Sequence, residues 1–100
     1  MRLRGRLADT PEARELPSGD QVVTFRLIVD RRGSRASQVA VDTIDCTVWS
    51  SALRRRVSAW SAGDVLTVEG ALRRRFWRSG EGARSRYDVE VSRASRQPSE

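Results

Sequence analysis

Most of the chain alternates between apolar and polar residues, which is the pattern of β-strands with one buried face. Five segments have this pattern and predict five strands, at residues 3–7, 22–32, 39–49, 64–77 and 84–92. The segment Asp9–Asp20 carries two prolines and the pair Ser18-Gly19, so we expect a short connection with turns. The glycine, serine and arginine residues of segment 32–37 predict a basic loop, and Ser79–Gly82 predicts a hairpin loop.

One segment has helical spacing instead. Leu53, Val57 and Trp60 recur at intervals of three and four residues, after a serine at 50 or 51 that suits a helix N-cap. Gly63 is a stop signal just beyond this helix. The predicted order is three strands, one helix and two strands. SH3-like barrels are also five-stranded, but a helix between strands three and four favours an all-β OB-fold, a five-stranded Greek-key barrel.

The length of 100 residues is enough for one domain with a single modest core. We predict an OB-fold over residues 1–93, followed by a short polar tail over residues 94–100. No segment approaches the roughly 20 apolar residues of a membrane-spanning helix, and the N-terminus lacks the apolar segment of a secretory signal. We therefore expect a cytoplasmic protein that has no membrane contact.

The net charge of +6 is unevenly distributed, and every basic residue is arginine. Residues 1–50 hold eight arginines and seven acidic residues, whereas residues 51–100 hold eleven arginines and six acidic residues. An excess of arginine in the second half indicates a polyanionic partner, because guanidinium groups bind phosphate and stack on aromatic rings. The alternative is a compositional bias with solvated arginines.

The composition argues against an enzyme. The chain has no histidine, one cysteine and no phosphate-binding loop of the G-x-x-x-x-G-K-[ST] type. A histidine-dependent catalytic triad, an imidazole or multi-thiolate metal site and an internal disulfide are therefore excluded. Paired carboxylates are the remaining catalytic option, and no acidic cluster stands out beside a pocket-like motif. Cys46 lies within an apolar strand pattern and is predicted to be a small buried residue rather than a reactive thiol. We expect no cofactor and no bound metal.

Aromatic and basic residues alternate near the end of the fourth predicted strand. Arg73, Arg75 and Trp77 fall on one face of this strand, and the hairpin adds Arg78, Arg84 and Arg86. Proteins that bind single strands without sequence preference combine a cationic groove with aromatic faces for the bases, which this arm could supply. The alternatives are a charged edge strand and packing of Trp77 against another subunit.

Trp49 ends the third predicted strand, on the face opposite Ile44, Cys46 and Val48. A tryptophan on a polar face requires a base or a protein surface as its partner. Trp60 has helical spacing and is predicted to be core, and Arg54–Arg56 are predicted to form a solvated helix face. We expect Arg74, which does not suit a core, to mark the point where the strand leaves the barrel as an exposed hairpin.

Several segments together resemble the bacterial single-stranded DNA-binding protein (SSB) family. The matching motifs, in chain order, are Gly5-Arg6-Leu7, Pro11-Glu12-Ala13-Arg14, Pro17-Ser18-Gly19, Ile44-Asp45-Cys46-Thr47-Val48-Trp49, Gly63-Asp64-Val65-Leu66-Thr67-Val68-Glu69-Gly70, Leu72-Arg73-Arg74-Arg75-Phe76-Trp77 and Arg86-Tyr87-Asp88-Val89-Glu90-Val91. The resemblance implies an OB-fold, assembly as a homotetramer, and binding of single-stranded DNA in replication, recombination and repair at the nucleoid.

By the same resemblance, Trp49 and Trp77 match base-stacking aromatics, and Arg73 and Arg75 match basic residues along the path of the strand. Our full set of candidate DNA contacts is Trp49, Trp77, Arg73, Arg75, Arg84, Arg86, Arg4 and Arg32. Two positions depart from the family: Thr43 lies where the family often has another stacking aromatic residue, and Gly33 lies near where some members carry a tryptophan. Members of the family usually continue into a flexible tail with an acidic, apolar tip that recruits replication proteins, whereas this sequence stops at Glu100. The resemblance is thus to a tail-less member or to the OB domain alone, and in either case we do not expect recruitment through such a tip.

The leading hypothesis is therefore sequence-independent binding and protection of single-stranded DNA. An alternative is a primosomal replication protein, a tail-less OB-fold that acts through protein contacts as well as DNA. The lack of a tail favours this alternative, whereas the matching family motifs favour a conventional member. A structural paralog that assembles with a full-length SSB is another alternative. RNA binding of the cold-shock type is disfavoured, since the chain lacks clustered aromatic residues on the second and third predicted strands.

Overall fold

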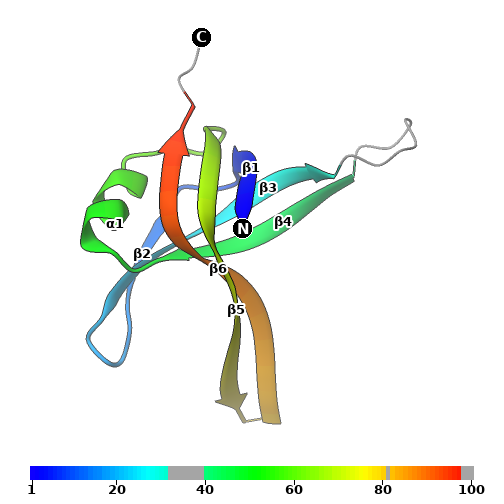
Figure 1. The fold of residues 1–100 in the computed structure, drawn as a ribbon. Coiled ribbons are helices and arrows are strands. Elements are labelled where there is room, and N and C mark those ends of the chain that lie inside the picture. Colours follow the sequence, from blue (N-terminus) through cyan, green and yellow to red (C-terminus); the bar gives the residue numbers. More distant parts are fainter. Residues whose placement is uncertain (32–39, 81, 98–100) are drawn as a thin grey trace.

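The computed structural model describes residues 1–31, 40–80 and 82–97, and for residues 31, 40, 75–79, 83 and 84 it describes the backbone alone. These residues form six strands and one helix, shown in Figure 1. The elements are β1 (Arg2–Leu7), β2 (Glu12–Glu15), β3 (Gln21–Arg31), β4 (Ala40–Val48), α1 (Ser51–Val57), β5 (Val65–Ser79) and β6 (Gly82–Arg96).

The strands form one sheet that closes into a barrel. Their order is β1-β5-β6-β4-β3-β2, and an additional pairing of β1 with β3 closes the sheet. All pairings are antiparallel except that of β4 with β6, in which Cys46 is opposite Val89 and Thr47 is opposite Glu90. This connectivity, with the helix between β4 and β5, is the predicted OB-fold.

The sixth strand lies in a segment that the sequence pattern did not mark as a strand. β1 pairs with β3 at Arg6 and Leu7, and β2 pairs with the earlier part of β3. The backbone N–H of Ala8, between β1 and β2, donates to the carbonyl of Arg26 at 2.9 Å. The prediction that Asp9–Asp20 is only a connection was therefore wrong for Glu12–Glu15, whose backbone forms a strand although all four side chains are exposed.

Two glycines allow the strands to cross closely at the bends of the barrel. A Cβ atom on Gly5 in β1 would lie 2.3 Å from the carbonyl oxygen of Ile28 in β3. A Cβ atom on Gly70 in β5, next to a bulge in the pairing with β6, would lie 2.2 Å from the carbonyl oxygen of Glu90. Both positions therefore require glycine, because a backbone oxygen cannot move aside as a flexible side chain can.

The core is built from the predicted inner faces of the strands. Its fully buried side chains include Leu27, Val48, Val57 and Leu66, and Ile44 and Val29 pack against them. Trp60 is 8% exposed, as predicted for a core residue. Cys46 is 1% exposed, and burial raises the pKa of its thiol to about 12, which keeps it neutral and unreactive.

The helix covers one end of the barrel and is shorter than predicted. Its N-cap is Ser50, and its buried residues are Leu53 and Val57. It ends at Val57, and a tighter turn follows in which the N–H of Trp60 donates to the carbonyl of Val57 at 3.0 Å. No helix in the described ranges is long and apolar enough to cross a membrane.

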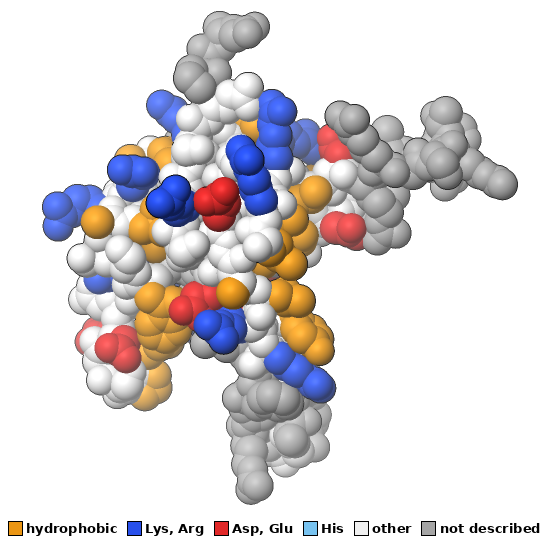
Figure 2. All heavy atoms as spheres, viewed as in Figure 1, with side chains coloured by type: hydrophobic (Ala, Val, Ile, Leu, Met, Phe, Trp, Pro, Cys, Tyr) orange, Lys and Arg blue, Asp and Glu red, His pale blue; other side chains and the backbone are white. Residues whose placement is uncertain are grey.

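β5 and β6 continue past the barrel as a long hairpin, which projects away from the other strands in Figure 1. The paired strands extend to Ser79 and Gly82. Leu72 and Tyr87, at the base of the hairpin, are 51% and 57% exposed, and Arg74 lies over the Tyr87 ring at 5.6 Å from its centre. Figure 2 shows hydrophobic side chains at the surface where the hairpin leaves the barrel.

The other end of β6 also extends further than predicted. β6 continues to Arg96, so the predicted domain boundary at residue 93 lies inside this strand. Ala94 is buried in the core, Ser95 is opposite Thr67, and Arg96 is opposite Leu66. The side chains of residues 92, 93, 95 and 96 are exposed, which explains why the pattern resembled a polar tail.

Replacing Gly5 with alanine should destabilise the barrel by about 1–3 kcal/mol, because the added methyl group overlaps a backbone oxygen of β3. Urea unfolding followed by circular dichroism measures this difference. Gly80→Ala is the control, since its added methyl group has no atom within 4 Å. Equal stability of Gly5→Ala and the wild type would show that β1 and β3 are not closely packed here.

Candidate nucleic-acid interface

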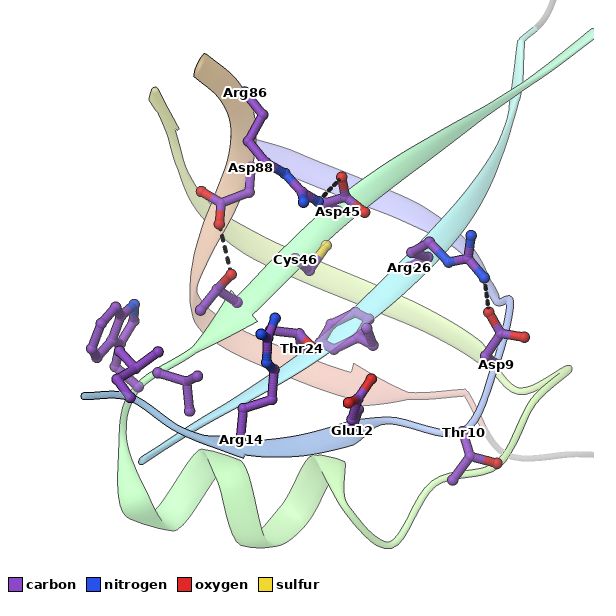
Figure 3. Close-up of a pocket in the computed structure, with 15 residues that line it drawn as sticks. Asp9, Thr10, Glu12, Arg14, Thr24, Arg26, Asp45, Cys46, Arg86 and Asp88 are labelled. Carbon is purple, nitrogen blue, oxygen red and sulfur yellow. Dashed lines mark hydrogen bonds and ion pairs between the residues drawn. The ribbon is translucent and has the colours of Figure 1, made fainter. Parts of the chain in front are cut away.

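A groove of about 480 Å³ lies on the outer side of the barrel, across β2, β3, β4 and β6 (Figure 3). The paired residues of β3 and β4 alternate between core and surface. Thr24 with Thr47 and Arg26 with Asp45 are therefore on the outer face. The parallel pairing of β4 with β6 adds Arg86 and Asp88 to the same surface.

The floor of the groove is fixed by polar contacts between β4 and β6. The Thr47 hydroxyl donates to the Asp88 carboxylate at 2.7 Å, and both residues are 8% exposed. The guanidinium group of Arg86 forms an ion pair with Asp45. Because these contacts join two strands at the only parallel pairing among the described elements, they hold the floor in one geometry.

A second ion pair lies at the other side of the groove. Arg26 of β3 forms an ion pair with Asp9, which precedes β2, and this hydrogen-bonded carboxylate raises the pKa of Arg26. Arg14 also lines the groove, and Figure 3 shows its side chain rising from β2 over the floor. Arg14 forms no ion pair or hydrogen bond with any described residue, so its charge is available to a ligand.

Trp49 lines the end of the groove, directly after β4. Its indole nitrogen is buried while the side chain as a whole is half-buried. Its backbone carbonyl accepts a hydrogen bond from Nε of Arg54 at 3.1 Å, and Arg54 also donates to Gln21 at 3.0 Å. Arg54 thus fixes the turn that positions Trp49, and is not simply the solvated helix residue that the sequence indicated.

The hairpin carries the next group of predicted contacts. Arg73 is exposed and forms an ion pair with Glu90 at 3.2 Å. The register places Arg75 opposite Arg86, and Trp77 opposite Arg84. The side chains of Arg75, Trp77, Arg78 and Arg84 lie outside the described residues, so the structure places these predicted contacts only by their backbone.

One predicted contact, Arg4, lies away from the groove. Arg4 of β1 is opposite Thr67 of β5, does not line the groove and donates to the Gln97 side chain at 2.6 Å. Arg32 lies outside the described residues. Arg14 and Arg26, which do line the groove, were not among the predicted contacts. Arg14 could have been found, because it belongs to the Pro11-Glu12-Ala13-Arg14 motif.

The groove is almost neutral overall. It carries four carboxylates and three guanidinium groups; the residues are Asp9, Glu12, Asp45, Asp88, Arg14, Arg26 and Arg86. Two of the three guanidinium groups are neutralised by ion pairs. A floor of this kind suits uncharged polar rings better than phosphates, and a tryptophan at its end offers a stacking surface.

The model of the Single-strand binding protein family matches residues 1–97. The chain belongs to the single-strand binding protein family. Among its relatives, the single-stranded DNA-binding protein of Clostridium tetani (strain Massachusetts / E88) is 34% identical over 90 residues. The alignment covers 89% of this chain and 61% of the relative. Single-stranded DNA-binding protein 1 of Staphylococcus aureus (strain COL) is 36% identical over 83 residues, covering 82% and 50%.

The fold agrees with this membership. A solved structure described as a Plasmodium falciparum SSB complex with ssDNA superposes with a TM-score of 0.77, at 20% identity, and covers 95% of the chain and 88% of that protein. The match shows that the chain has the fold of that SSB. The family member spans only about half to three fifths of the length of the two bacterial relatives.

Replacing Thr47 with valine should destabilise the protein by about 1–3 kcal/mol, because it removes a donor from the buried Asp88 carboxylate. Chemical denaturation measures the change. Thr43→Val is the matched control, since Thr43 lies on the same face of β4 and is not buried. If the two variants lose the same stability, the hydrogen bond between β4 and β6 does not hold the groove floor.

Proposed function

We propose that this protein binds and protects single-stranded DNA without reading its sequence, in replication, recombination and repair. The observation that carries the proposal is the groove on the outer face of β3, β4 and β6, which Trp49 and three arginines line in a member of the single-strand binding protein family. The relatives named above are single-stranded DNA-binding proteins, which supports the same ligand here.

The groove and the hairpin both contact the single strand in this proposal, through its bases and through its phosphates. Bases stack on the Trp49 indole and on Trp77 of the hairpin, and every base has a face that can stack, so the sequence matters little. Arg14 contacts phosphate directly. Arg73, Arg75, Arg84 and Arg86 line the path of the backbone along the hairpin. Bases of a duplex are already stacked and paired, so they are not available to this surface.

The ion pairs of the groove affect how the binding depends on salt concentration. Arg86 and Arg26 are held by Asp45 and Asp9, so a phosphate that uses either guanidinium group must compete with a carboxylate. Raised salt weakens contacts with phosphate further, because the free energy gained by releasing counterions falls as the salt concentration of the solution rises. We therefore expect binding by stacking to persist at salt concentrations that remove much of the electrostatic contribution.

The proposal includes assembly with further copies of the chain, as the homotetramer of the family implies. Leu72 and Tyr87 lie at the base of the hairpin of β5 and β6, and both are more than half exposed in the single chain. Exposed apolar residues at such a place support burial against another copy. A protein with this ligand acts in the cytoplasm, at the nucleoid.

Titration with an oligo-dT strand tests the function through tryptophan fluorescence. We expect strong quenching by the single strand, little by a duplex, and weaker binding at raised salt. Trp77→Ala should weaken binding by about 1–3 kcal/mol, the loss of one stacked base. Trp60 is the internal control: it is 8% exposed, so Trp60→Phe should leave the affinity unchanged. Unchanged affinity of Trp77→Ala would remove that residue from the interface, and a wild type that binds no strand would contradict the function.

A further inference from the structure

A second groove, of about 390 Å³, lies toward the C-terminal end of β6 and contains none of the residues named in the proposed function. It is formed by α1, β1, β5 and β6, with Arg2, Arg56 and Arg93 as its basic residues and Glu69 as its one acidic residue. Figure 2 shows arginine side chains gathered over the upper part of the barrel, where β5 and β6 pass beside α1 in Figure 1. At Arg54–Arg56 the sequence favoured a solvated helix face over a binding surface.

The charges of this groove differ from those of the first. None of its three guanidinium groups forms a hydrogen bond or ion pair with another residue in the described part of the chain. In the first groove, Arg26 and Arg86 are both neutralised by carboxylates. The second groove therefore carries a net positive charge, since its three guanidinium groups outnumber its single carboxylate, and this charge attracts an anion.

The side chains of the second groove suit phosphate groups and do not suit bases. Guanidinium groups form paired hydrogen bonds with phosphate oxygens, and hydroxyl groups such as those of Thr67 and Ser95 are frequent backbone contacts in nucleic-acid complexes. The groove has no aromatic side chain among its described lining residues on which a base could stack, and its apolar lining consists of Leu53 and Ala94. Its ligand is therefore recognised through negative charge.

The two grooves lie along one strand. Asp88 of β6 lines the first groove and Ser92 lines the second. Four residues of strand span about 13 Å, so a polyanion that leaves the first groove along β6 reaches the second within a few nucleotides. We propose that the second groove binds backbone phosphates of the same single strand whose bases occupy the first groove, an inference that rests on the proposed function.

Strands of two lengths test this inference. OB-folds cover about 4–16 nucleotides, so a dT strand of about 4 nucleotides occupies the first groove alone, and one of about 16 reaches the second. The double variant Arg56→Gln/Arg93→Gln should bind the short strand as the wild type does and the long strand more weakly. The slope of log K against log salt for the long strand should become shallower by about 0.7 for each phosphate that the variant no longer neutralises.

Two further variants make the result specific. Arg55→Gln removes the same charge from the neighbouring position of α1, which does not line the groove. This variant should reduce the affinity for the long strand less than Arg56→Gln does. Arg14→Gln, in the first groove, should reduce the affinity for strands of both lengths. All four arginines are exposed, so the variants should fold with the stability of the wild type.

Four outcomes would overturn the inference. An equal loss of affinity for the long strand in Arg55→Gln and Arg56→Gln would show a general effect of positive charge and no specific role of the groove. Unchanged binding of both lengths by the double variant would contradict the second groove and leave the proposed function intact. A wild type that binds neither length would contradict the function, and the inference with it. A double variant that loses affinity for poly-glutamate but keeps the long strand would show that the groove binds acidic peptides instead.

Discussion

Two parallel residue pairs join β4 to β6, and the arrangement of the outer groove depends on this short connection. On its inner side, Cys46 and Val89 enter the core; on its outer side, Thr47 donates to the Asp88 carboxylate. The connection places Trp49, at the end of β4, on the same surface as the start of the hairpin. Without it, β6 would not lie beside β4, and the groove that crosses both strands would not exist.

The close glycine crossings make this connection possible, because they let the strands bend sharply enough for the barrel to close. Gly5 admits the carbonyl of Ile28, and Gly70 admits that of Glu90, next to the bulge in β5. The same bend separates β6 into a half that lines the outer groove and a half that lines the basic groove. One strand thus connects a nearly neutral surface suited to bases with a basic surface suited to phosphates.

The core of the fold could be predicted from the sequence, because Val23, Phe25 and Leu27 alternate with polar residues as a strand with one buried face requires. β2 could not, since Glu12–Glu15 is held by backbone pairing with β3 and has no apolar pattern. The sequence placed Trp49 on the outer face correctly. It could not show that Arg86 is paired with Asp45, 41 residues away, because such an ion pair exists only once the barrel has closed.

In the proposed complex, a single strand lies across the outer face of β3, β4 and β6. Backbone amide shifts, mapped by NMR during titration with a short dT strand, locate this path residue by residue. We expect the largest changes at Thr24, Thr47, Trp49 and Asp88, with little change at residues 61–64 beyond the helix. Changes confined to the opposite side of the barrel, with the amides of the groove unaffected, would contradict the proposed path.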